Sequence, residues 1–101
     1  MLIPEPVMND GAPPIRHNEA AQRFETTIDG KLSRADYRLH DGVMHMVHTE
    51  VPIDQEGRGI AAMVVRAALE YARAHGYKVR PACSYVRSFM ARNREFDDLR
   101  A

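Results

Sequence analysis

The chain has 101 residues, enough for one domain with a modest core and too few for a separate substrate domain. Its 14 basic and 14 acidic side chains give a formal net charge of zero, which argues against a nucleic-acid-binding protein. No stretch approaches the roughly 18 apolar residues of a membrane-spanning helix, and the N-terminus lacks the pattern of a secretory signal. The single cysteine, Cys83, excludes an intramolecular disulfide, so we expect a cytoplasmic protein. The lack of a long apolar stretch leads us to expect no membrane partner.

The first segment, residues 1–14, contains four prolines and one glycine. Proline lacks a backbone donor and glycine is conformationally permissive, so we expect an irregular N-terminal tail in this segment. The predicted domain then occupies residues 15–101.

Three β-like runs follow, at residues 23–28, 31–40 and 43–51. The pairs that separate them are Asp29-Gly30 and Asp41-Gly42. An Asp-Gly pair between two such runs is the strongest short-range hairpin signal, because type I′ turns need a positive φ at both central residues. The sequence therefore predicts an antiparallel β-meander.

A helix is predicted next, from about Gly59 to His75. Its apolar side chains recur at helical spacing, at Ile60, Met63, Val64, Ala67, Ala68 and Tyr71. Gly76 is placed to end this helix in a left-handed conformation.

A fourth strand at 77–81 and a second helix from Ser84 or Tyr85 to about Asn93 complete the order β-β-β-α-β-α. Because a helix connects them, the third and fourth strands are expected to be parallel neighbours. The charged residues after Asn93 suggest a solvated surface.

The junction between the third strand and the first helix contains a glycine-rich turn with Gly57 and Gly59. The first N–H groups of a helix lack intrahelical partners and carry a partial positive charge, so such a turn can hold a phosphate. The turn has neither the Lys-Ser/Thr of a P-loop nor the chain position of a dinucleotide-binding fingerprint. It indicates a site for a cofactor that bears a pyrophosphate.

Over about residues 15–100, the sequence resembles a small single-domain branch of the GNAT superfamily of N-acetyltransferases. The superfamily signature is Gln/Arg-x-x-Gly-x-Gly/Ala, which this chain matches at Gly59 and Ala61 but not at Glu56. The branch is recognised by four segments, present here as Phe24-Glu25 with Asp29-Gly30, His48-Thr49-Glu50-Val51-Pro52, Glu56-Gly57-Arg58-Gly59-Ile60-Ala61 and Cys83-Ser84-Tyr85-Val86.

The resemblance implies a minimal GNAT-like α/β (α+β) fold that binds acetyl-CoA. The pyrophosphate would meet the backbone of Gly57, Arg58, Gly59, Ile60 and Ala61, and the pantetheine would pair with the end of the third strand, near Val51 and Ile53. Arg58 could also contact a phosphate through its side chain. The helices that a typical GNAT enzyme carries between its first two strands are absent, since a two-residue turn joins them. The acceptor side should therefore be open and suit a large acceptor, such as a protein lysine or N-terminus.

Candidate catalytic residues come from the same resemblance. Cys83 would lie near the acetyl group, as a transient acetyl acceptor, as a proton donor to the CoA thiolate, or as a buried structural residue. Tyr85 would protonate the thiolate or pack the helix on the sheet. His48 and Glu50 are candidate general bases, since alternation places them on one strand face with Met44 and Met46. His45 and His48 would then lie on opposite faces, so we expect no metal site.

The sequence thus predicts an acetyl-CoA-dependent N-acetyltransferase, without identifying the amine that accepts the acetyl group. A CoA-binding sensor or interaction module with little catalysis is the alternative. A structural domain that binds no cofactor is the third possibility.

Overall fold

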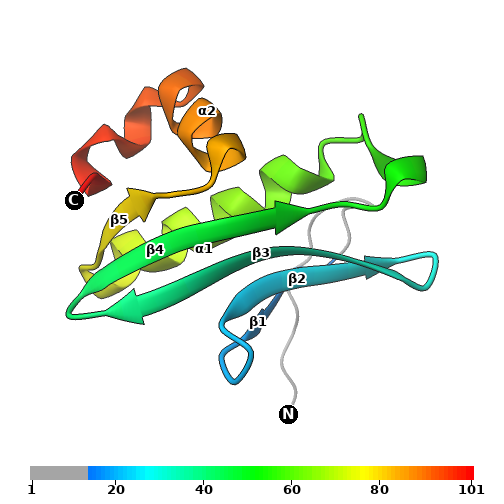
Figure 1. The fold of residues 1–101 in the computed structure, drawn as a ribbon, viewed down its shortest axis with the longest axis horizontal. Coiled ribbons are helices and arrows are strands. Elements are labelled where there is room, and N and C mark those ends of the chain that lie inside the picture. The colour runs from blue at the N-terminus through cyan, green and yellow to red at the C-terminus, as the bar shows by residue number, and fades with distance from the viewer. Residues whose placement is uncertain (1–13) are drawn as a thin grey trace, which may run out of the picture.

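The computed structural model of the protein describes residues 14–101, which form one sheet with helices packed against it (Figure 1). The strands are β1 (Arg16–Asn18), β2 (Arg23–Ile28), β3 (Lys31–His40), β4 (Val43–Glu50) and β5 (Lys78–Pro81). The helices are α1 (Ile60–His75) and α2 (Ser84–Arg92), with short 3-10 helices η1 (Ile53–Gln55) and η2 (Arg94–Leu99). Apart from Pro14, the expected tail at 1–14 lies outside the described residues, so the domain boundary stays a prediction. In the described part of the chain, no helix is long and apolar enough to cross a membrane.

The predicted meander is confirmed. Strands β2, β3 and β4 pair as antiparallel neighbours, and the two Asp-Gly turns join them. All four turn residues, Asp29, Gly30, Asp41 and Gly42, have positive φ angles, as this hairpin type requires. Strand β5 pairs in parallel with β4, which confirms the predicted crossover through α1. The sheet order is β1-β2-β3-β4-β5.

The sequence did not predict β1, an edge strand of three residues that is too short to show alternation. It is held by the nearly buried carboxylate of Glu25, which accepts hydrogen bonds from Arg16, Asn18 and Arg23. Burial alone would raise the pKa of Glu25, but these donors outweigh it and the pKa is lowered. The Phe-Glu pair therefore has two structural roles: Phe24 enters the core, and Glu25 fastens the sheet edge.

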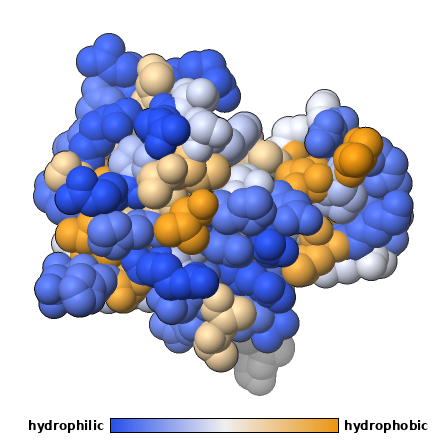
Figure 2. Space-filling view, in the orientation of Figure 1, coloured by the Kyte–Doolittle hydropathy of each residue, from blue (hydrophilic) through white to orange (hydrophobic). Residues whose placement is uncertain are grey.

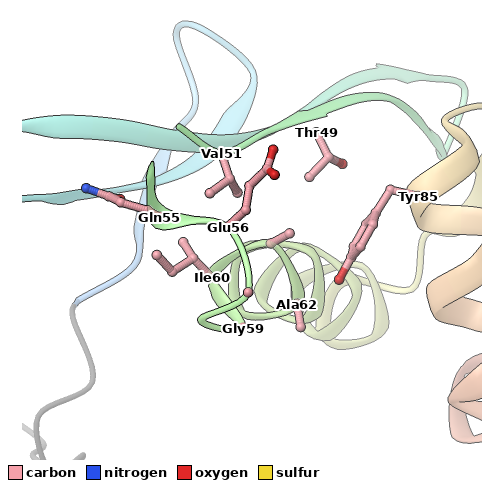
Figure 3. A pocket seen from close by; sticks show the side chains of 10 residues that line it. Thr49, Val51, Gln55, Glu56, Gly59, Ile60, Ala62 and Tyr85 are labelled. Carbon is pink, nitrogen blue, oxygen red and sulfur yellow. The ribbon is translucent and has the colours of Figure 1, made fainter. Parts of the chain in front are cut away.

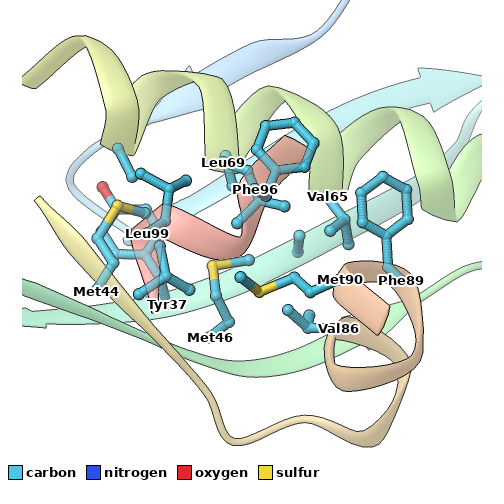
Figure 4. Packing of buried hydrophobic residues seen from close by; sticks show 14 of the residues in the cluster. Tyr37, Met44, Met46, Val65, Leu69, Val86, Phe89, Met90, Phe96 and Leu99 are labelled. Carbon is cyan, nitrogen blue, oxygen red and sulfur yellow. The ribbon is translucent and has the colours of Figure 1, made fainter. Parts of the chain in front are cut away.

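The second unpredicted element is η2. Its sequence is mostly charged, but it also contains two core side chains, Phe96 and Leu99, which are 1% and 5% exposed. Figure 4 shows both of them packed with residues of the sheet and the two α-helices. The guanidinium groups of Arg66 and Arg73 lie over the Phe96 ring, at 5.4 and 5.6 Å from its centre. The segment after Asn93 therefore closes the core, although its charges face solvent.

A β-bulge interrupts the pairing of β3 with β4. Tyr37 pairs with Met46, but the next residue back along β3, Asp36, pairs with His48, so Val47 is the extra residue. A bulge of one residue reverses the faces of all side chains beyond it.

The bulge overturns the predicted face of His48 and Glu50. Met44 and Met46 are fully buried, whereas His48 and Glu50 are exposed on the opposite face. Thr49 now follows the two methionines onto the helix-covered face, because it pairs with the buried Ala35. The expectation failed because simple alternation has no signal for an inserted residue.

We predict that Phe96→Ala lowers the free energy of unfolding by about 3–5 kcal/mol, the usual cost of removing a buried aromatic ring. Urea denaturation followed by circular dichroism measures it. Arg94→Ala is the matched control in the same short helix, because this side chain is 78% exposed and should change stability by less than about 0.5 kcal/mol. Equal stabilities of the two variants would show that η2 does not close the core.

Candidate active site

The site lies where β4 and β5 separate. Their parallel pairing ends at Met46 and Pro81, while β4 continues to Glu50. Proline has no N–H to extend the ladder, and the Cys83 N–H donates instead to the Met46 carbonyl oxygen at 2.9 Å. Beyond this bond, no strand within residues 14–101 pairs with the edge of β4 on the β5 side.

A cavity of about 430 Å³ opens between this edge of β4, the start of α1 and the start of α2. Figure 3 shows its lining, which consists of Thr49, Val51, Gln55, Glu56, Gly57, Gly59, Ile60, Ala61, Ala62 and Tyr85. In the space-filling view, a notch in the outline separates the end that holds η1 from the α2 side (Figure 2). The lining is mostly apolar with a few polar groups, as in many small-molecule sites.

The start of α1 forms one wall of the cavity. Its N-cap residue is Gly59, with a φ of 80°, and no side chain caps the exposed N–H groups. No acidic residue occupies the first turn, so the positive end of the helix is not neutralised within its own sequence. Gly57 also has a positive φ, of 86°, which other residues rarely adopt. This wall can bind an anion through backbone N–H groups alone.

The structure brings together most of the predicted cofactor-binding residues. Val51, Gly57, Gly59, Ile60 and Ala61 all line the cavity. The two that it leaves outside are Arg58, whose side chain is exposed, and Ile53, which is 85% exposed in η1.

Cys83 lies at the edge of the cavity, as the N-cap residue of α2. Its S–H donates to Thr49 Oγ1 at 3.6 Å, across the gap between the two strands. Burial alone would raise the pKa of Cys83, but the N–H groups of Val86 and Tyr85 and the Thr49 hydroxyl favour the thiolate, and the pKa is lowered. Cys83 is half-buried and packs against the core cluster; it is not itself among the residues that line the cavity, although its neighbours Thr49 and Tyr85 are.

Tyr85 lines the cavity from the first turn of α2. Figure 3 shows its ring across the cavity from Val51 and Glu56, with the hydroxyl directed towards α1 near Ala62. The ring is also 6.4 Å from that of Phe89 in the same helix and packs against the core cluster, so a packing role, the alternative to a catalytic one, stays open.

His48 and Glu50 do not line this cavity. His48 Nε2 lies 3.0 Å from Glu50 Oε1, and Glu50 also pairs with Arg34 at 3.2 Å. The hydrogen bond with His48, followed by the charge of Arg34, lowers the pKa of Glu50. The bulge also brings His48 to the face of His45, contrary to expectation. Even so, residues 14–101 contain no group of three metal-ligating side chains.

Four residues of the lining were not predicted, namely Thr49, Gln55, Glu56 and Ala62. Thr49 was missed because its face depends on the bulge. Gln55 is 1% exposed and donates from Nε2 to the Ile28 carbonyl oxygen at 2.8 Å, which ties the segment between β4 and α1 to the β2–β3 turn. An ion pair of 2.6 Å between Lys31 and Asp54 reinforces this link. In the sequence, Glu56 is a departure from the GNAT signature and the first residue of a segment that is typical of the branch, without a predicted role in the site.

Comparison with known proteins agrees with this geometry. Residues 23–99 match the family described as GCN5-related N-acetyl-transferase. The chain belongs to this family. Protein NATD1 of Bos taurus is 31% identical over 93 residues, which cover 82% of this chain and 81% of the relative. Protein NATD1 of Mus musculus is 27% identical over 95 residues, with 89% and 86% covered.

The fold is also found in a solved structure. The NMR solution structure of a GCN5-like protein from Staphylococcus aureus matches with a TM-score of 0.65, over 91% of each chain and at 21% identity. This likeness supports the GNAT-like α/β fold alone, while the family match identifies the chain as an N-acetyltransferase. The predicted family and fold class are confirmed.

We predict that Thr49→Val raises the pKa of the Cys83 thiol, because valine has the same shape but no hydroxyl to stabilise the thiolate. The pH dependence of alkylation by iodoacetamide measures this pKa. Thr49→Ser keeps the hydroxyl and should retain the lowered pKa. An identical alkylation profile for wild type and Thr49→Val would contradict the effect of this contact on the thiol.

Proposed function

We propose that this N-acetyltransferase uses acetyl-CoA, and that the pyrophosphate binds at the start of α1. The observation that carries the proposal is the uncapped helix N-terminus on the cavity wall, preceded by glycines at 57 and 59 with positive φ angles. Oriented N–H groups with no side chain in front of them favour a phosphate. Arg58 could add a charge-assisted contact from the rim of the site.

The pantetheine is proposed to follow the unpaired edge of β4, near Val51 and Ile53. Val51 lines the cavity, and the strand has lost its neighbour at this point, so its backbone groups are free to pair with the amides of the pantetheine. The acetyl group would then lie near Thr49, Cys83 and Tyr85.

Two roles are proposed for Cys83, as transient acetyl acceptor or as proton donor to the departing thiolate. Its lowered pKa supports the first role. Tyr85 is the alternative donor, because its hydroxyl already lies in the cavity. His48 and Glu50 stay candidates for the proton acceptor only if the amine approaches from the other face of the sheet, through the gap beside β4.

The proposed acceptor is an amine, and an open site favours a large one such as a protein lysine or N-terminus. β2 and β3 are joined directly by the Asp29-Gly30 turn, so no helix between them narrows the site. The alternative is a CoA-binding sensor, which would bind acetyl-CoA without steady CoA release in the presence of amines. The cytoplasm is the proposed compartment, since a lone thiol stays reduced there.

Acetyl-CoA should stabilise the folded protein by about 2.7 kcal/mol when its concentration is 100 times the dissociation constant. The melting temperature should rise accordingly. We predict that Ala61→Glu weakens this binding at least about tenfold, or 1.4 kcal/mol, because a carboxylate at the helix start repels the pyrophosphate. The same charge favours the helix itself, so the fold should be kept. Isothermal titration calorimetry measures the affinity.

The control for this variant is Ala20→Glu, which adds the same charge to an exposed turn between β1 and β2. It should bind acetyl-CoA as wild type does. Equal affinity in both variants would show that the pyrophosphate does not bind at the start of α1. A wild-type protein whose melting temperature does not change with acetyl-CoA would indicate a domain that does not bind this cofactor.

We predict that Cys83→Ala abolishes covalent labelling by acetyl-CoA and lowers turnover at least about tenfold. Intact-protein mass spectrometry detects the acetyl group, and CoA release measures turnover. Reduced turnover without any labelled wild-type intermediate would select the proton-donor role. Unchanged acetyl transfer by the variant would exclude Cys83 from the reaction.

A further inference from the structure

Glu56 places a carboxylate in the wall of the cavity. Figure 3 shows this side chain turned towards the end of β4, between Val51 and Thr49 in that view, and all three residues line the same space. Within residues 14–101, Glu56 takes part in none of the ion pairs. No lysine, arginine or histidine is among the lining residues.

The cavity therefore has two ends of opposite electrostatic character. The N–H groups at the start of α1 favour an anion, since the first turn contains no acidic residue and the N-cap glycine has no side chain. The carboxylate of Glu56 favours a cation and opposes a second anion at the β4 side. A ligand set that satisfies both ends combines a phosphate group with a positively charged group near Thr49.

From this charge distribution we propose that Glu56 binds the ammonium group of the acceptor and accepts its proton. The inference rests on the proposed use of acetyl-CoA and adds a substrate class, amines that are protonated at neutral pH. Glu56 and Tyr85 are the only ionisable side chains that line the cavity in the described part of the chain. Glu56 would supply the base, and Tyr85, the alternative to Cys83 as proton donor, lies on the opposite wall.

The alternative bases are less well placed for this cavity. His48 and Glu50 bond to each other at 3.0 Å, and Glu50 is also paired with Arg34. Both side chains lie on the face of the sheet away from Thr49, as the bulge dictates. An amine in the cavity therefore meets Glu56 before it meets either of them.

The proton and electron balance of the step is simple. The ammonium gives one proton to Glu56, and the nitrogen lone pair attacks the carbonyl carbon of the acetyl group. The C–N bond forms, the C–S bond breaks, and its electron pair leaves on the CoA sulfur. The nitrogen loses its second proton to solvent as the amide forms, and the thiolate takes one proton from Tyr85. Solvent then reprotonates Tyr85 and takes the proton held by Glu56. One proton is released to solvent for each acetyl group transferred.

The test compares two acceptors with the intact chain and acetyl-CoA. The first is a lysine peptide, whose amine has a pKa of about 10.4 and is charged at neutral pH. The second is an arylamine, which is uncharged there and needs no base before it attacks. Glu56→Gln keeps the shape and has the residue type of the GNAT signature, so acetyl-CoA binding should be equal or tighter by calorimetry.

We expect Glu56→Gln to lower kcat/KM for the lysine peptide by about 100-fold, the lower range for loss of a general base. The value for the arylamine should stay within about threefold, since no proton must be removed first. The loss for the peptide should shrink as the pH approaches the pKa of its amine. Glu70→Gln, on an exposed position of α1, is the control and should match wild type with both acceptors.

Three results would overturn the role of Glu56: wild-type rates in Glu56→Gln with the peptide, equal losses with both acceptors, or a peptide-selective loss in Glu50→Gln instead. Each of these leaves acetyl-CoA binding intact. A wild-type protein that fails to bind acetyl-CoA would instead reject the proposed function, and the role of Glu56 with it.

Discussion

The separation of β4 from β5 is the constraint on which the site depends. Pro81 cannot donate to the ladder, and the Cys83 N–H takes the Met46 carbonyl that would otherwise continue it. A buried strand edge without partners is costly, so the opening is stable only where solvent or a ligand satisfies it. The same bond fixes Cys83 beside Thr49. One proline and one hydrogen bond therefore set both the opening beside β4 and the position of Cys83 next to it.

The bulge at Val47 decides which side chains face that opening. Before it, the methionines of β4 fill the core; after it, Thr49 and Val51 reach the cavity while His48 and Glu50 turn away. The strand thus changes from a core element to a binding surface without leaving the sheet. Because the two methionines are fully buried, the pairing of β3 with β4 between the turn and the bulge cannot slip by one residue without exposing them.

The sequence predicts what depends on local chemistry. The Asp-Gly turns, the helical spacing of α1 and the glycines before it are local signals, and each element they predict is present. The bulge, the short strand β1 and the buried residues of η2 depend on contacts between distant segments. Phe96 lies among acidic neighbours that indicate a surface, but it packs in the core cluster and beneath the guanidinium groups of Arg66 and Arg73, which are distant in sequence. The cavity-facing role of Thr49 was hidden for the same reason.

Both α-helices begin at the cavity without the usual capping residues. Gly59 and Cys83 occupy the two N-cap positions, neither side chain makes a capping hydrogen bond, and neither first turn contains an acid. A serine or aspartate at Cys83 would stabilise α2 by about 1 kcal/mol. Without such caps the helices are less stable, but the partial positive charge at both N-termini can interact with other groups. At α2 the group is the thiol of Cys83, whose pKa is lowered. At α1 the N-cap and the first turn supply no side chain to the N–H groups, as an anion site requires, and Glu56 carries the opposite charge at the end of the cavity near Thr49.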